Sequence, residues 1–254
     1  MTTSVRPLLF AWQFLTAVPL SRDHHQPAAG ELAGSMMWYP LVGMLLGGLL
    51  AVTDLLLARW LSHEVVAGLL ILLLVAVTRG LHQDGLADTV DGLAGGRTSA
   101  ERLAIMRDPH IGALGATGLF LSLILKYSAI VSLSDVTRFP ALLCVPAMGR
   151  WAMVAGAYGS PYARPEGGLG APFLADLSVK HVIGSTVLIA CLLTVTFGVV
   201  PAGVFLAAGA AIARMMTMFF RRVLGGVTGD TLGATNEVAE IIFLLSVPLT
   251  DLIP

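Results

Sequence analysis

Apolar runs of membrane-spanning length are the feature that most restricts what this chain can fold into. A helix needs about 20 predominantly apolar residues to cross a bilayer. Candidate runs occupy residues 36–57, 65–78, 111–133, 140–158, 182–200, 202–220 and 238 to the C-terminus. None alternates polar and apolar residues as the strands of a membrane barrel do. The runs therefore predict an all-α polytopic membrane protein with about seven transmembrane helices, within a range of six to eight.

Composition supports the same class. Charged residues make up 12% of the 254-residue chain, about half of the roughly 25% found in an ordinary globular domain. The N-terminal stretch PLLFAWQFLTAVPL is too short to cross a bilayer and ends without a small-residue cleavage site, so we expect an interfacial or re-entrant helix there. We treat residues 1–254 as one integral membrane domain.

The basic residues predict the orientation. If the runs alternate sides, ten Lys and Arg residues fall on one side and only Arg59 and Arg138 on the other. The positive-inside rule makes the richer side cytoplasmic. Its ten residues are Arg6, Arg22, Arg79, Arg97, Arg102, Arg107, Arg164, Lys180, Arg221 and Arg222. The three longest connections, residues 79–110, 159–181 and 221–237, emerge on this side, so we expect the chemistry to be cytoplasmic.

Three further cations, Lys126, Arg150 and Arg214, fall within the apolar runs. Charge inside a membrane is costly and is by default a sign of function. The plainer alternative is that each cation pairs with a carboxylate or extends its side chain to the interface.

The stretch RGLHQDGLADTVD carries the strongest sign of chemistry. Asp84, Asp88 and Asp91 stand at i, i+4 and i+7, so a helix would place all three carboxylates on one face. Their mutual repulsion calls for a cation, and carboxylate oxygens suit Mg²⁺, or Mn²⁺ in its place. Asp108, at the far end of the loop, is the expected fourth ligand. Alternatively, the aspartates pair with the arginines of the same loop as a solvated network.

The other two cytoplasmic connections add polar candidates. Arg164 and Glu166 in YGSPYARPEGGLG form either a phosphate clamp or an ordinary connector. In GGVTGDTLGATNEVAE we expect Asp230, Asn236 and Glu237 to form a polar pocket wall. Thr235 or Asn236 is expected to cap the last helix. Arg107 is available to bind phosphate, and Thr98 or Ser99 to cap a short helix that ends at Met106.

Four motifs in order, GLHQDGLADTVDGLAGG, ERLAIMRDPHIGALG, YARPEGGLG and TGDTLGATNE, resemble the cobalamin synthase family of adenosylcobinamide-GDP ribazoletransferases. The resemblance implies a Mg²⁺-dependent transferase of the cell inner membrane whose active site faces the cytoplasm. In such an enzyme a ribose hydroxyl of α-ribazole, or of its 5′-phosphate, attacks adenosylcobinamide-GDP and displaces GMP. The expected partners are these substrates and the lipid bilayer, with no nucleic acid. A homo-oligomer, or association with other cobalamin-assembly enzymes, stays open.

The resemblance is carried over residue by residue. His82, Asp84, Asp88 and Asp91 match the acidic motif of the family, and Asp108 matches the aspartate of its second block. Other matching polar positions, expected to bind substrate together with Asn236, are Arg107, Arg164, Glu166, Asp230 and Glu237. The general base is either an aspartate that does not bind metal or His82.

Two other functions are kept as alternatives. The Asp-x-x-Asp-Gly pattern of residues 88–92 also resembles the CDP-alcohol phosphotransferases, although Gly95 and Gly96 stand where that motif continues with Ala-Arg. A transporter would have a similar set of apolar helices, but it predicts inverted repeats, which the sequence does not show.

Overall fold

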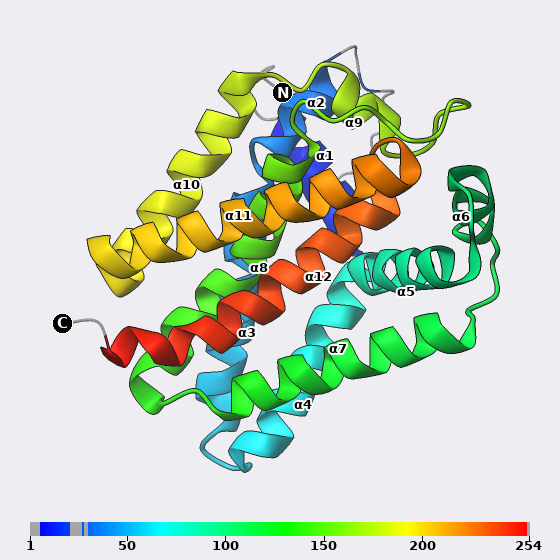
Figure 1. Cartoon of the computed structure of the whole chain (residues 1–254). Coiled ribbons are helices and arrows are strands. Elements are labelled where there is room, and N and C mark those ends of the chain that lie inside the picture. The colour runs from blue at the N-terminus through cyan, green and yellow to red at the C-terminus, as the bar shows by residue number, and fades with distance from the viewer. Residues whose placement is uncertain (1–5, 21–26, 28–29, 253–254) are drawn as a thin grey trace.

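The computed structural model describes residues 6–20, 27 and 30–252. These residues form twelve α-helices, one short 3-10 helix and no named strand, which confirms the all-α prediction (Figure 1). The helices are α1 (Arg6–Leu15), α2 (Glu31–Met36), α3 (Tyr39–Leu57), α4 (His63–Thr78), α5 (Leu81–Gly95), α6 (Ser99–Ile105), α7 (Ala113–Val131), α8 (Asp135–Ala157), α9 (Ala171–Ala175), α10 (Val179–Phe197), α11 (Val199–Leu224) and α12 (Gly229–Ser246), followed by the 3-10 helix η1 (Val247–Leu252).

Six of the described helices are long and apolar enough to cross a membrane: α3, α7, α8, α10, α11 and α12. The count becomes seven if α4 and α5, which meet at an angle of 89°, form one broken span. The predicted range of six to eight spans is therefore confirmed. Helix α1 has only ten residues, too few to cross a bilayer, as the sequence indicated.

The start of α12 differs from the prediction. Thr228 is the residue that caps this helix, because its hydroxyl accepts a hydrogen bond from the Thr231 N–H at 3.2 Å. The expectation that Thr235 or Asn236 caps it is wrong. The connection predicted at residues 221–237 is correspondingly reduced to residues 225–228, and the polar residues assigned to it lie on the first turns of α12. The short helix α6 is capped by Thr98, as expected.

Helices α3 and α8 pack closely because two glycines of α3 face the α8 backbone. Gly43 and Gly47 are one turn apart, the spacing of the small-residue motif that lets membrane helices approach each other. A Cβ atom built on Gly43 would overlap backbone atoms of Ala147, and one built on Gly47 would overlap the Leu143 carbonyl. The adjacent Gly48 has only a leucine side-chain atom near its Cβ position, at 3.9 Å.

The catalytic candidates lie where α5, α7 and α12 come together. Figure 1 shows α5 running alongside α7, with α12 on its other side and α6 at its far end. Helix α12 also packs on α8, so it stands between the α3–α8 pair and the segment that carries the aspartates.

These contacts predict that Gly47→Ala and Gly48→Ala have opposite effects on stability. The added methyl group at Gly47 would force α3 away from α8, and overpacking of this kind costs about 1–3 kcal/mol. At Gly48 the same change should be neutral, or should stabilise the helix by about 0.5–1 kcal/mol, because alanine is the better helix former. Thermal unfolding of the two variants in the same detergent measures the difference. Equal effects would show that the α3–α8 contact is not as close as described.

Candidate active site

Helix α5 is set in place by a sharp bend after α4. Arg79 and Gly80 have positive φ angles of 55° and 64°, and Arg79 is the one non-glycine residue with positive φ in the described part of the chain. This backbone conformation costs about 1–2 kcal/mol for a residue with a Cβ atom. The Arg79 guanidinium donates a hydrogen bond to the Ala17 carbonyl at 3.2 Å. The bend turns the acidic motif away from α4 and lays it against α7 and α12.

An acidic cluster forms where α5 meets the start of α12. Asp84 and Asp88 are one turn apart on α5. The carboxylates of Asp84, Asp230 and, more weakly, Asp91 lie close enough to repel that of Asp88, and Asp84 also repels Asp230 of α12. Gly85 permits the contact, since a Cβ atom there would lie 2.8 Å from the Asp230 carbonyl oxygen. Asp230 accepts hydrogen bonds from Arg164 Nη2 at 2.7 Å and from the Thr228 hydroxyl at 3.3 Å. We call Asp84, Asp88 and Asp230 the acidic cluster.

Asp91, the third aspartate of the predicted metal site, has a different set of partners. Its two carboxylate oxygens accept hydrogen bonds from the backbone N–H groups of Gly112 and Gly115, each at 2.7 Å. Gly112 is the residue before α7, so Asp91 caps that helix from a neighbouring one. A negative charge at a helix N-terminus is stabilising. The structure therefore gives Asp91 a role in joining α5 to α7.

Asp108 is exposed and lies in the connection between α6 and α7. Hydrogen bonds from the His110 backbone N–H at 2.9 Å and from its ring Nδ1 at 2.7 Å hold the pKa of Asp108 below its usual range. Arg107 pairs with Glu166 of the next connection. The Glu166 backbone N–H, together with this arginine, lowers the pKa of the Glu166 carboxyl. In the described residues no three His, Cys, Asp or Glu side chains are arranged as metal ligands, so the predicted quartet is not assembled.

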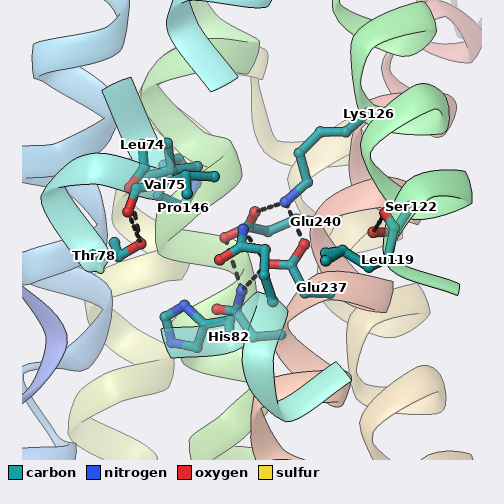
Figure 2. Close-up of polar contacts among 12 residues, drawn as sticks. Leu74, Val75, Thr78, His82, Leu119, Ser122, Lys126, Pro146, Glu237 and Glu240 are labelled. Atoms are coloured by element: carbon teal, nitrogen blue, oxygen red, sulfur yellow. Dashed lines mark hydrogen bonds and ion pairs between the residues drawn. The ribbon is translucent and has the colours of Figure 1, made fainter. Parts of the chain in front are cut away.

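A buried ionic network connects α7, α8 and α12 (Figure 2). Lys126 Nζ of α7 lies between two carboxylates of α12, 2.8 Å from Glu237 Oε2 and 2.7 Å from Glu240 Oε2. Arg150 of α8 pairs with the other oxygen of Glu240. All four residues are at most 2% exposed. Two cations thus balance two carboxylates inside the bundle, which confirms the simpler interpretation of Lys126 and Arg150 as paired charges.

Helix α5 joins this network through its first turn. Gln83 Nε2 donates to Glu237 Oε1 at 3.2 Å, and Arg150 Nη2 lies 3.4 Å from His82 Nδ1. A guanidinium group only donates hydrogen bonds, so Nδ1 must accept and the imidazole proton lies on Nε2. Within the described structure, Nε2 is buried and has no hydrogen-bond partner.

Glu240 was not expected from the sequence, and Glu237 and Asn236 lie inside the helix bundle rather than in a loop. Glu240 interrupts an apolar run. The sequence feature that could have pointed to it is the presence of two cations, Lys126 and Arg150, inside apolar runs, because two buried cations need two carboxylates. Asn236 Nδ2 donates to Glu240 Oε1 at 3.0 Å. Asn236 and Glu237 are at most 1% exposed. Both residues are therefore part of the network, and their contact with substrate stays a prediction.

Two cavities meet at Asp84. The small cavity, of about 160 Å³, has mostly apolar walls together with His82, Asp84 and Asp230. The large cavity, of about 590 Å³, lies between α1, α4, α5 and α7. Phe14, Leu81 and Asp84 line both. The acidic cluster is thus open to two spaces of very different size.

Comparison with known proteins identifies the family. The sequence profile described as cobalamin-5-phosphate synthase matches residues 7–248. No solved structure matches the chain.

Several curated relatives carry the name adenosylcobinamide-GDP ribazoletransferase. The protein from Syntrophobacter fumaroxidans is 42% identical over 84% of this chain and 86% of its own length. The protein from Chlorobium phaeobacteroides is 35% identical over 95% and 97%, and that from Pseudomonas fluorescens is 40% identical over 96% and 99%. Similarity of this extent confirms the resemblance predicted from the four motifs. The chain belongs to the cobalamin-5-phosphate synthase family.

Proposed function

We propose that this protein joins α-ribazole, or α-ribazole 5′-phosphate, to adenosylcobinamide-GDP and releases GMP. The observation that carries the proposal is the acidic cluster at the junction of α5 and α12, because two of the four family motifs meet there. The names of the relatives support the same activity. A diphosphate substrate also suits a site that combines carboxylates with an arginine, Arg164.

The chemistry of the acidic cluster suits Mg²⁺, although its three carboxylates would have to draw together to bind one ion, because no three described side chains are arranged as metal ligands. Asp84, Asp88 and Asp230 offer only carboxylate oxygens, which hard divalent cations prefer, and their repulsion would be relieved by a cation. When bound, Mg²⁺ would neutralise negative charge that develops on the phosphates. Asp91 and Asp108 would first have to leave the partners described above, so we propose them as ligands only of a rearranged site. Mn²⁺ would suit the same oxygens.

The remaining chemistry falls to the side chains of the chain itself. The ribose oxygen forms a new ester bond to the phosphorus of the cobinamide-linked phosphate, and the bond from that phosphorus to the bridging oxygen breaks. GMP leaves with the bridging oxygen, and a carboxylate of the acidic cluster accepts the hydroxyl proton. We favour a carboxylate over His82 as the base because Arg150 Nη2 already lies 3.4 Å from the His82 Nδ1 atom. Arg164 would hold a phosphate oxygen once substrate displaces it from Asp230.

We place the protein in the cell inner membrane with this site on the cytoplasmic side. The bias of ten basic residues against two supports the orientation, although Arg22 lies outside the described residues.

The activity itself is the first prediction. Detergent-purified protein, incubated with Mg²⁺, adenosylcobinamide-GDP and α-ribazole, should release GMP. Chelation with EDTA should abolish the release, and added Mg²⁺ should restore it, because the carboxylates alone would repel the diphosphate. Release of CMP from a CDP-alcohol instead would favour the phosphotransferase alternative. Absence of both products would favour the alternative that the protein is a transporter.

Asp88→Asn should lower GMP release more than tenfold while leaving folded protein in the membrane. The amide keeps the shape of the side chain but removes a charge that a divalent cation needs. Asp176→Asn, the same change at an exposed aspartate of the 159–181 connection, is the control and should stay fully active. Retention of more than a tenth of the activity in Asp88→Asn would contradict the metal assignment.

Asp91→Asn separates a capping role from a metal-binding role. If Asp91 caps α7, the variant should lose about 0.5–2 kcal/mol of stability and keep the Mg²⁺ concentration for half-maximal activity unchanged. A matched Asp84→Asn variant should raise that concentration. A similar rise in Asp91→Asn would show that Asp91 binds the metal.

A further inference from the structure

Among the described residues that line the two cavities meeting at Asp84, Arg79 is the one lysine or arginine. It stands at the bend between α4 and α5, and both Arg79 and Asp84 line the large cavity. Both residues are exposed, so a ligand in the cavity can reach their charged groups. The large cavity therefore offers a cation and a carboxylate of the acidic cluster to the same ligand.

The Arg79 guanidinium keeps most of its donors free for a ligand. A guanidinium group carries five N–H donors, and the hydrogen bond described for this side chain runs from Nη2 to the Ala17 carbonyl at 3.2 Å. In the described part of the chain, no carboxylate lies within ion-pair distance of it. Arg164, by contrast, already pairs with Asp230 and lines neither cavity. The positive charge of Arg79 is thus available to an anion.

Glycine would suit the backbone at this position better than arginine. Arg79 ends α4 with a φ angle of 55°, a conformation that glycine adopts readily and that a residue with a Cβ atom adopts at a cost. Helices commonly end with glycine in this conformation. The bend alone therefore does not explain an arginine here, whereas a guanidinium group that binds substrate would.

The two charges that line the large cavity suit a diphosphate. Arginine binds phosphate oxygens through two parallel N–H groups, and a divalent cation at Asp84 would bind other oxygens of the same diphosphate. Gly80, which follows Arg79, is one helical turn from Asp84, a rise of about 6 Å. One diphosphate group can therefore lie between the arginine and the carboxylate.

We infer that Arg79 binds a phosphate group of adenosylcobinamide-GDP in the large cavity, beside Asp84. The inference rests on the proposed function. It makes Arg79 a substrate-binding residue of the reaction in addition to Arg164, and it places the diphosphate on the side of the acidic cluster that opens to α1, α4 and α7.

Arg79→Gly separates substrate binding from a role in the bend. The variant should raise the KM for adenosylcobinamide-GDP about tenfold or more, which is the effect of one hydrogen bond to a charged group. The KM for α-ribazole should not change. Because glycine relaxes the backbone, the thermal unfolding midpoint should stay the same or rise.

Two further variants test the guanidinium group itself. Arg79→Gln removes the charge but keeps an N–H donor for the Ala17 carbonyl, so it should raise the same KM as much as Arg79→Gly does. Arg79→Lys keeps the charge without the paired donors and should raise it less. Arg59→Gly, at an exposed arginine of the connection between α3 and α4 that lines neither cavity, is the matched control and should keep both KM values.

A role confined to the bend predicts the opposite pattern. Arg79→Gly would then lower the thermal unfolding midpoint and kcat, and Arg79→Gln would leave the KM for adenosylcobinamide-GDP unchanged. That result would overturn the inference. A loss confined to the use of α-ribazole 5′-phosphate would also overturn it, because Arg79 would then bind the phosphate of the nucleophile.

Failure of the proposed function gives a different result, in which wild-type protein releases no GMP. Calorimetric titration of the same proteins with inorganic pyrophosphate and Mg²⁺ then decides the inference. Binding that is about tenfold weaker in Arg79→Gly and Arg79→Gln than in wild-type protein supports it. Equal binding in all three proteins, or no binding to any of them, overturns it.

Discussion

The arrangement of the helices depends on four charged side chains that neutralise one another inside the bundle. Lys126 of α7 and Arg150 of α8 both pair with carboxylates of α12. In a buried pair, removal of one partner leaves an uncompensated charge and costs about 3–5 kcal/mol. Neither helix can turn or slide against α12 without separating such a pair. The network therefore fixes the surface against which α5, the helix of the acidic motif, is placed.

Glycines at the helix contacts make these short ion pairs possible, because a glycine has no side chain to hold two helices apart. A Cβ atom on Gly149 of α8 would lie 2.7 Å from the Glu240 Cγ atom, so alanine there would push α8 away from α12. On the other side of α12, Gly233 packs on the backbone of His82, and a Cβ atom there would lie 3.3 Å from the His82 carbonyl oxygen. Gly85 of α5 makes the matching contact with Asp230. The glycines let the helices come close enough for the ion pairs to form, and the ion pairs in turn hold the helices at that distance.

These contacts explain which parts of the structure could be predicted from sequence. The spans follow from the length of apolar runs, which depends on local composition alone. The start of α12 was misplaced because the stretch GDTLGATNE has the composition of a loop. Its glycines serve helix packing, and Thr228 supplies the cap. The single helical face of Asp84, Asp88 and Asp91 was expected from their spacing, but spacing does not reveal that Asp91 caps α7 or that Asp230 approaches from α12. Both facts depend on tertiary contacts.

The network also bears on why a membrane enzyme would keep charges in its interior. A transport path requires polar groups that reach water, whereas Lys126, Arg150, Glu237 and Glu240 are at most 2% exposed and balance one another. The pairs continue from Lys126 through Glu240 and Arg150 to His82, where the acceptor role of Nδ1 fixes which nitrogen carries the proton. The charges therefore extend as far as His82, the first polar residue of the acidic motif. The acidic cluster stays outside the network, so neither Lys126 nor Arg150 neutralises its carboxylates, and a divalent cation would take that role.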